Sequence, residues 1–484
     1  MSFNADKHWN ELARTVETDL MARIPEHKLR PRLEPTRRAV ELLGDPQHSY
    51  RIIHVTGTNG KTSTTRIIER ILREHGLRTG RFTSPHLVRF NERISLDGES
   101  VSDERLYLVW QDIKPILELV DAELEAAGDT KLTFFEALAV LGFAIFADAP
   151  VDVLVLEVGM GGTWDSTNVA DGDVAVFTPI AIDHAERLGQ SIVEIAETKS
   201  GIIKPEAMVV SSSQPADAEL VLQSKSEQIA SSWAQFGSAF GVLEAAVEGF
   251  GQRFSVRGLA GEYRDLFIPL LGQYQVENAA VAIAAVEAFL GGGSHPISHD
   301  VLRVALADAT SPGRLQVVNR NPMLILDAAH NPHGAAALGA VLRESVTAPE
   351  FIGVVSILND KDHLGILREF AEVFDSVVIT QSESPRAISY QELADEAAVI
   401  FGEDRVLSAA TVSQALDLAR EIAQSETTAV VVTGSITLVG EVLKLQQDLD
   451  SDWDESDSED EFDGYQESTD HEADLEQNED DPID

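Results

Sequence analysis

The stretch HVTGTNGKTST, residues His54–Thr64, decides how the rest of the chain is interpreted. It is similar to a phosphate-binding loop, but its glycines are unusually close together. The common nucleotide loop, G-x-x-x-x-G-K-[ST], has four residues between its glycines. Here only Thr58 and Asn59 separate Gly57 from Gly60. The stretch is therefore a defective loop, an unrelated turn, or a nucleotide loop with its own geometry.

The flanking residues favour the third interpretation. Residues 51–55 predict a strand and Lys61–His75 predict a helix, which is the context that a phosphate loop requires. The N–H groups of a glycine turn and the start of a helix both stabilise a phosphate. An ordinary strand–helix turn with a surface lysine is the alternative. We expect ATP to contact Gly57, Thr58, Asn59, Gly60, Lys61, Thr62 and Ser63, with Lys61 also a catalytic residue.

Downstream, short apolar runs alternate with helical stretches. Strands are predicted at 79–82, 151–159, 173–180 and 207–213, and a buried helix at Thr133–Ala147. This alternation is typical of an α/β domain with a mainly parallel sheet. We predict that residues 1–308 form this first domain, a P-loop-type ATPase unit.

A second alternating block follows Ser311. Its predicted strands are 323–327, 351–355, 376–380 and 429–435, with helices at Leu364–Val373 and Val412–Gln424. We predict a smaller Rossmann-like α/β domain over 309–447. From Asp448 to Asp484 there are 19 acidic residues and no lysine or arginine, so we expect a disordered acidic tail over 448–484.

Charge and composition exclude several classes of function. The net charge is −44, and outside the tail 62 acidic residues still oppose 37 basic ones, which disfavours nucleic-acid binding. The chain has no cysteine, so disulfides and thiolate metal sites are excluded. Neither a signal-peptide core nor an apolar run long enough for a bilayer is present. We therefore expect a cytoplasmic protein with no membrane partner.

The glycine loop resembles the shortened ATP loop of the Mur ligase superfamily. Further stretches resemble its folylpolyglutamate synthase/dihydrofolate synthase branch, over about residues 25 to 447. They are FTSPHLVRFNERI (Phe82–Ile94), TFFEAL (Thr133–Leu138), LEVGMGGTWDSTN (Leu156–Asn168), IDHAERLG (Ile182–Gly189), KSGIIKP (Lys199–Pro205), SPGRLQ (Ser311–Gln316) and LDAAHNPHG (Leu326–Gly334).

The resemblance implies an ADP-forming amide ligase. Such an enzyme uses ATP to convert a carboxylate of dihydropteroate or a reduced folate into an acyl phosphate, which the amine of L-glutamate attacks. Catalysis of this kind rests on positioning and charge neutralisation. The resemblance also implies a Mur-ligase central-type first domain, a monomer, and two Mg²⁺ sites.

The same resemblance assigns metal-binding residues. Ser84, Glu157 and His184 match the family's Mg²⁺ ligands, with Glu157 at the position of the bridging carboxylate and His184 at a second ion. Singly, a serine before proline also fits a turn and a lone histidine also fits a structural role; the set in family order favours metal binding. Lys199 matches a catalytic lysine that CO₂ carbamylates in the family, although its residue pattern alone also fits an exposed helical lysine.

Further residues match the nucleotide and pterin positions of the family. Asn278, Arg314 and Asp327 match ATP contacts, and Arg314 with Asp327 also fits a domain-bridging ion pair. His330 either assists at the reacting phosphate or caps its turn. The positions that match dihydropteroate contacts are Thr133, Phe134, Phe135, Glu136, Trp164, Asp165 and Ser166, although core aromatics would explain the phenylalanines equally well.

Two other functions remain open from the sequence. A cell-wall Mur ligase acting on a UDP-muramoyl substrate would keep the chemistry and change the acceptor, but the SPHL and TFFE stretches count against it. A nucleotide-binding regulator would be expected to lack metal ligands, whereas Ser84, Glu157 and His184 are all present.

Overall fold

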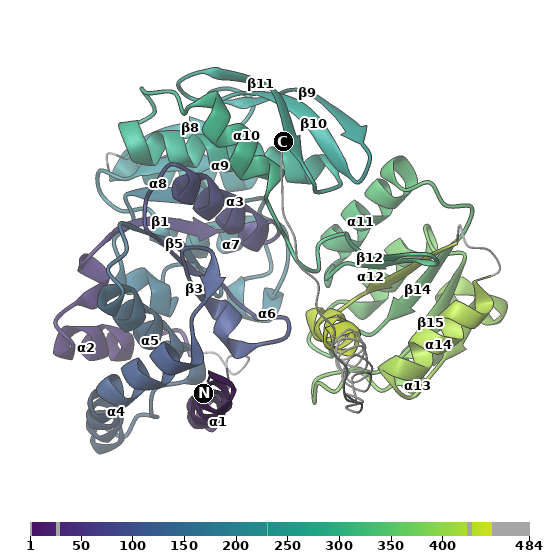
Figure 1. Cartoon of the computed structure of the whole chain (residues 1–484), viewed down its shortest axis with the longest axis horizontal. Helices are drawn as coiled ribbons and strands as arrows, with labels where there is room; N and C mark the ends of the chain where they lie inside the picture. Colours follow the sequence, from purple (N-terminus) through teal and green to yellow (C-terminus); the bar gives the residue numbers. More distant parts are fainter. Residues whose placement is uncertain (1, 26–29, 230, 424–427, 448–484) are drawn as a thin grey trace, which may run out of the picture.

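A computed structural model describes residues 2–25, 30–229, 231–423 and 428–447. Figure 1 shows two lobes, each built around its own sheet. The predicted acidic tail, residues 448–484, lies outside the described residues. No helix in the described ranges combines the length and apolarity needed to cross a membrane.

The N-terminal lobe contains an eight-stranded sheet in the order β4-β3-β2-β5-β1-β6-β7-β8. The strands from β2 to β8 in that order run parallel, whereas β3 and β4 are antiparallel additions at one edge. Their bounds are β1 Arg51–Thr56, β2 Thr79–Phe82, β3 Ile94–Leu96, β4 Glu99–Ser100, β5 Val153–Glu157, β6 Val174–Phe177, β7 Met208–Ser211 and β8 Ser232–Gln235.

Ten α-helices surround this sheet within the described residues. They are α1 Ser2–Met21, α2 Glu34–Leu42, α3 Lys61–Glu74, α4 Asp103–Ala126, α5 Phe134–Asp148, α6 Ala185–Leu188, α7 Ile192–Lys199, α8 Ala216–Gln228, α9 Gln273–Gly291 and α10 His299–Ala307. Side chains of β5 alternate between two cores: Val153 and Val155 pack towards α3 and α9, and Leu154 and Leu156 towards α5. Burial on both faces explains the continuous apolar run of this strand.

A three-stranded antiparallel sheet, which the sequence analysis did not predict, covers α9 and α10 at the top of the lobe (Figure 1). It consists of β9 Gly241–Glu248, β10 Gly251–Arg257 and β11 Glu262–Ile268. Helix α4 was also not predicted; its interior proline, Pro115, obscures the helical pattern in the sequence.

The C-terminal lobe contains a six-stranded sheet in the order β12-β13-β17-β14-β15-β16, parallel except for β12. The strands are β12 Gln316–Arg320, β13 Met323–Leu326, β14 Phe351–Val355, β15 Ser376–Ile379, β16 Val406–Ser408 and β17 Ala429–Thr433. Helices α11 Pro332–Ser345, α12 His363–Ala371 and α13 Tyr390–Phe401 cover one face, and α14 Val412–Ile422 with a helix over 436–447 covers the other.

The predicted mixed α/β class with a separate C-terminal α/β lobe is confirmed, as is each strand predicted in the two blocks. The chain crosses from one lobe to the other between Ala307 and Gln316. The predicted boundary at 308/309 lies in this connection.

Candidate active site

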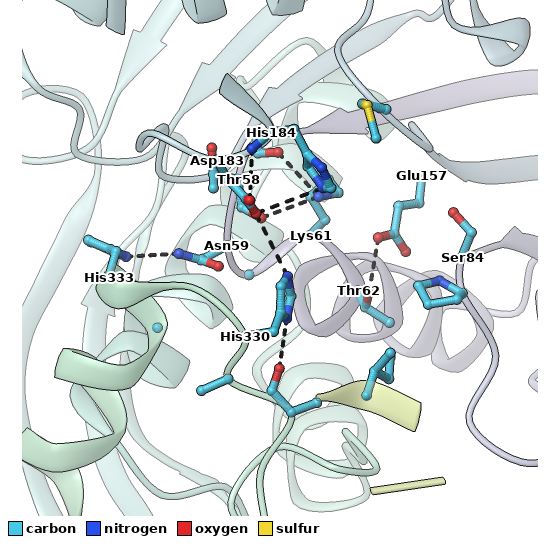
Figure 2. Close-up of a pocket in the computed structure, with 18 of the residues that line it drawn as sticks. Thr58, Asn59, Lys61, Thr62, Ser84, Glu157, Asp183, His184, His330 and His333 are labelled. Atoms are coloured by element: carbon cyan, nitrogen blue, oxygen red, sulfur yellow. Dashed lines mark hydrogen bonds and ion pairs between the residues drawn. The ribbon is translucent and has the colours of Figure 1, made fainter. Parts of the chain in front are cut away.

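A cavity of about 320 Å³ lies between the two lobes, at the carboxyl ends of β1 and β5 (Figure 2). In parallel sheets this edge is where ligands bind, because loops and helix N-termini converge there. The N-terminal lobe contributes the whole glycine loop to the lining, and the C-terminal lobe contributes the segment around Asp327 to Leu338. The cavity therefore unites segments that are far apart in the sequence.

The close spacing of the glycines has a geometric reason. Gly57 has φ +149°, and a side chain there would collide with Thr178 on β6's following loop. Gly60 has φ +86° and stands at the N-terminus of α3, where a Cβ would lie 2.8 Å from Asn278 Oδ1. Both positions thus need glycine. The two residues between them are anchored, because the N–H groups of Thr58 and Asn59 donate to the Pro179 carbonyl at 2.9 and 3.4 Å.

Lys61 is folded back over its own loop. Its Nζ donates to the carbonyls of Gly57 and Thr58 at 3.2 and 3.3 Å. Burial lowers its pKa, while the carboxylates of Glu157 and Asp183 oppose that shift. Main-chain carbonyls compensate a buried ammonium only in part, so a phosphate in the cavity would be the stronger partner.

Glu157 ends β5 with one carboxylate oxygen lacking a partner. Its Oε1 accepts from Thr62 Oγ1 at 2.9 Å, but its buried Oε2 has no hydrogen bond to any described residue. Burial raises the pKa of Glu157 to about 7, and Lys61 acts in the opposite direction. A buried carboxylate oxygen without a donor is costly, so a cation fits this position.

The oxygen atoms beside Glu157 are of the type that Mg²⁺ prefers as ligands. Ser84 lines the cavity beside Glu157, and the Thr62 hydroxyl donates a hydrogen bond to the Glu157 carboxylate (Figure 2). Across the described ranges, no three acidic or histidine side chains converge as a metal cage. Mg²⁺ is commonly held by one or two protein ligands together with substrate phosphates, so this sparse set fits an ion that binds with nucleotide.

His184 lies apart from Ser84 and Glu157. Its Nε2 is 3.3 Å from Lys361 Nζ and 3.9 Å from Asp183 Oδ2. Burial and the neighbouring Lys361 together lower its pKa to about 4, so the imidazole is neutral at pH 7 and able to bind a metal. The predicted role of His184 at a second ion stays a prediction.

Lys199, at the end of α7, points at the same glycine loop. Its buried Nζ donates to the Gly57 carbonyl at 2.7 Å. Burial and the nearby ammonium of Lys61 lower the pKa of Lys199 to about 7. A substantial neutral fraction is therefore present at neutral pH. The alternative of an exposed helical lysine is wrong, because Lys199 is 3% exposed.

The predicted residues around the nucleotide approach from both lobes. Asn278 on α9 packs beside Gly60, while Arg314 and Asp327 line the opposite wall. Asp327 accepts from the N–H groups of Leu315 and Ala329, both at 2.9 Å. Among the described residues Asp327 forms no ion pair with Arg314, which also lines the cavity.

His330 has one hydrogen-bonded ring nitrogen and one that lies near a carboxylate. Its Nδ1 lies 2.8 Å from the Ala328 carbonyl, and its Nε2 lies 3.8 Å from Asp183 Oδ2. Burial lowers its pKa to about 3, with Lys361 acting in the same direction. His330 thus stabilises its turn and also lines the cavity, so the two predicted roles are compatible.

Polar contacts between the lobes involve residues that the sequence analysis did not single out. Lys361 Nζ bonds Asp183 Oδ1 at 2.9 Å, and Asn331 donates to Asp183 at 3.2 Å. The glycine loop joins them, because Asn59 Nδ2 lies 2.8 Å from His333 Nδ1 (Figure 2). The position of Lys361 after the end of β14 was the only sequence signal for it, because parallel strands place functional loops at that end.

The seven predicted pterin residues divide into two groups. Phe135 and Asp165 line the cavity, whereas the other five are absent from its lining: Thr133, Phe134, Glu136, Trp164 and Ser166. Phe134 packs in the core, and Thr133 with Glu136 forms the capping box that begins α5. Asp165 accepts from Met160 N and from the N–H and hydroxyl of Thr167, at 2.6 to 2.9 Å.

Comparison with known proteins agrees with this two-lobed site. Residues 55–286 match the Mur ligase middle domain, and residues 313–436 match the Mur ligase glutamate ligase domain. The dihydrofolate synthase/folylpolyglutamate synthase of Mycobacterium tuberculosis is 41% identical over 447 residues, covering 88% of this chain and 92% of the relative. The folylpolyglutamate synthase of Lacticaseibacillus casei is 37% identical, and the match covers 74% of this chain and 84% of the relative.

Solved structures give the same result. Mycobacterium tuberculosis folylpolyglutamate synthase complexed with ADP and AMPPCP matches with a TM-score of 0.86 at 40% identity, over 90% of this chain and 98% of that one. Folylpolyglutamate synthase from Thermotoga maritima matches with a TM-score of 0.77 at 32% identity, over 90% of this chain and 96% of that one. The chain therefore belongs to the dihydrofolate synthase/folylpolyglutamate synthase family of the Mur ligases.

Proposed function

We propose that this protein is an ATP-dependent, ADP-forming ligase that adds L-glutamate to dihydropteroate, to reduced folates, or to both. One observation carries the proposal: a single cavity joins the glycine loop to Glu157 on one wall and to Arg314 on the other. Such a cavity can hold a triphosphate and an acceptor carboxylate together, which is what acyl-phosphate formation requires.

The reaction has two steps. A carboxylate oxygen of the acceptor attacks the γ-phosphorus, the bond from that phosphorus to the β-phosphate oxygen breaks, and ADP leaves. The glutamate amine then attacks the acyl carbon, phosphate leaves, and the amine loses a proton. Lys61 and Arg314 are the proposed cations that neutralise the transferring phosphoryl group. Asp327 is the proposed acceptor for a ribose hydroxyl, with Asn278 beside the loop.

Two Mg²⁺ ions are proposed, one held by Glu157, Ser84 and Thr62, and one by His184. The unpartnered Oε2 of Glu157 supports the first. When bound, these ions neutralise phosphate charge. The protein's own contribution is to keep the carboxylate buried and aimed at the phosphates, so that little reorganisation is needed.

Carbamylation of Lys199 is proposed as part of the same site. A neutral lysine amine adds to CO₂, forming an N–C bond and releasing a proton, so that a cation becomes an anion. The pKa of Lys199, lowered to about 7, supplies the neutral amine. The resulting carboxylate would lie near Gly57, where it would relieve the repulsion between Lys199 and Lys61.

The incoming glutamate needs cations of its own because it carries two carboxylates. Lys361 and Arg386 line the cavity from the C-terminal lobe and are not needed for the proposed triphosphate contacts. Lys361 is paired with Asp183, and Arg386 with Asp360 at 3.2 Å. We propose that they bind the glutamate carboxylates. The pterin is proposed to lie beside Phe135, with the other predicted pterin residues supporting that wall.

The function is tested by the release of ADP with dihydropteroate, tetrahydrofolate and a UDP-muramoyl acceptor in parallel, each with and without glutamate. We expect turnover only when glutamate accompanies one or both of the first two acceptors. ATP turnover indifferent to acceptor and glutamate would contradict the proposal. Turnover with the UDP-muramoyl acceptor alone would replace it with the cell-wall reaction.

A further inference from the structure

The loop that follows β2 joins the candidate metal site to the C-terminal lobe. It contains Ser84, which lines the cavity, and Leu87, three residues later, which packs against the far lobe. Leu87 contacts the cluster that contains Leu438, Val439 and Val442, all on the helix over 436–447. Ser84 is therefore tied by three residues of backbone to an element of the other lobe.

The contact at Leu87 is unusually close. A side-chain carbon at Gly440, in the 436–447 helix, would collide with the carbonyl oxygen of Leu87. Only glycine allows the helix to approach the loop backbone so closely. The side chain of Leu87 lies against Gly313 as well, where a Cβ would stand 3.4 Å from it and 2.9 Å from Val439. Gly313 and Val439 thus form a socket for the Leu87 side chain, and Gly440 leaves room for the Leu87 carbonyl oxygen.

The loop itself is stiff. The carboxylate of Glu92 accepts from three successive N–H groups, those of Leu87, Val88 and Arg89, at 2.7 to 2.9 Å. Three charge-assisted hydrogen bonds to one carboxylate fix the backbone of this turn. A displacement of Leu87 therefore moves residues 87–89 as a unit, and only Pro85 and His86 separate this unit from Ser84.

We propose that Leu87, seated against Gly440, is a positioning residue through which the C-terminal lobe sets the place of Ser84. This inference rests on the proposed function, since it takes Ser84 as a ligand to the ion beside Glu157. The C-terminal lobe contains none of the predicted metal ligands, yet it controls one of them. A shift of about 1 Å in a positioned group can change a rate by about a hundredfold.

The test compares Gly440→Ala with Gly261→Ala in the full-length protein. Gly261 is the matched control because it lies in the turn before β11 and a Cβ there meets nothing nearer than 3.4 Å. We expect Gly440→Ala to lower kcat about tenfold or more and to raise the Mg²⁺ concentration that gives half the maximal rate, with KM for ATP changed less than about twofold. Hydrogen exchange at the amides of 87–89 should also become faster.

A structural defect of the helix would not give this pattern. Alanine inside a helix is ordinarily more favourable than glycine, so the helix itself should not weaken. Leu87→Ala should reproduce the Mg²⁺ shift, and Leu87→Met should restore most of kcat, because methionine refills the socket. The two Leu87 variants also test the inference if Gly440→Ala does not fold.

Two outcomes would overturn the inference. One is Gly440→Ala matching Gly261→Ala in kcat, Mg²⁺ dependence and exchange. The other is Leu87→Ala keeping the wild-type Mg²⁺ dependence. Failure of the proposed function would look different, because the wild-type protein itself would then release no ADP with either pterin acceptor.

Discussion

The two polar regions of the N-terminal lobe differ in how far the protein satisfies them. At the glycine loop, Glu157 keeps a buried oxygen without a partner among the described residues, and Lys61 bonds only main-chain carbonyls. At the start of α5, Glu136 accepts from Arg32 at 2.8 and 2.9 Å and from the Thr133 N–H at 2.7 Å. Both carboxylates are buried, but only the second is fully bonded.

The difference teaches how to separate ligand-binding groups from supporting groups. Buried polar atoms are nearly always hydrogen-bonded in folded proteins, so an exception calls for a missing partner. Glu157 has such a gap, which a cation would fill, and Lys61 is paired with main-chain carbonyls but with no anion. Glu136 has no such gap, although the sequence resemblance assigns it to the pterin.

The largest effect is expected for Lys61→Ala. Without this ammonium, the transferring phosphoryl group loses a charge partner inside a buried site, and kcat/KM for ATP should fall about a thousandfold. Steady-state ADP release with glutamate and acceptor present measures it. The matched control is Lys131→Ala, since Lys131 is exposed and pairs only with exposed Glu125 at 3.4 Å.

If Lys61→Ala kept wild-type catalysis and nucleotide affinity, Lys61 would not be a ligand-binding group. The bonds from Lys61 to Gly57 and Thr58 would then be its whole role, as a brace for the loop. Thermal unfolding with and without ADP distinguishes a structural role from a phosphate contact. Loss of a structural contact lowers the stability in both conditions, whereas loss of a phosphate contact lowers only the stabilisation by ADP.

A smaller loss, about a hundredfold, is expected for Lys199→Ala, which removes a group that orients the site but not the phosphate contact itself. Because burial holds the pKa of Lys199 near 7, its amine is increasingly protonated below that pH and neutral above it. Activation of CO₂-depleted wild-type enzyme by bicarbonate should therefore be weaker below pH 7 and stronger above it. Initial rates across pH measure this effect.

The variant distinguishes carbamylation from a general need for lysine. Lys199→Ala should show no response to bicarbonate at any pH, whereas Lys131→Ala should respond as wild type does. A carbamate carbon should also be visible by NMR after exposure to ¹³C-bicarbonate, and absent in Lys199→Ala. Full activity in Lys199→Ala, or a wild-type enzyme indifferent to CO₂, would remove Lys199 from the reaction.

Much of this arrangement could be predicted from local sequence. The glycine loop depends on residues adjacent in the chain, and the apolar runs of β1 and β5 are local patterns, so both were predictable. Lys361 and Leu87 were not, because their roles arise only when the lobes meet; Lys361 and Asp183 are 178 residues apart. The hydrogen bonds from Arg32 to Glu136 could not be predicted for the same reason, since 104 residues separate the two.

The smallest effect on catalysis is expected for Glu136→Ala, because Glu136 is the buried carboxylate whose oxygens are both hydrogen-bonded. Its removal leaves the Thr133 N–H without its partner and takes one of two carboxylates from Arg32, which still bonds Asp129 at 2.9 Å. The free energy of unfolding should therefore fall by about 1–3 kcal/mol. KM for the pterin acceptor should change less than about twofold, because Glu136 is absent from the cavity lining. Chemical denaturation and steady-state kinetics measure the two quantities, with exposed Glu125→Ala as the control. A raised KM at unchanged stability would instead make Glu136 a pterin contact, and full hydrogen bonding would then no longer identify a supporting residue.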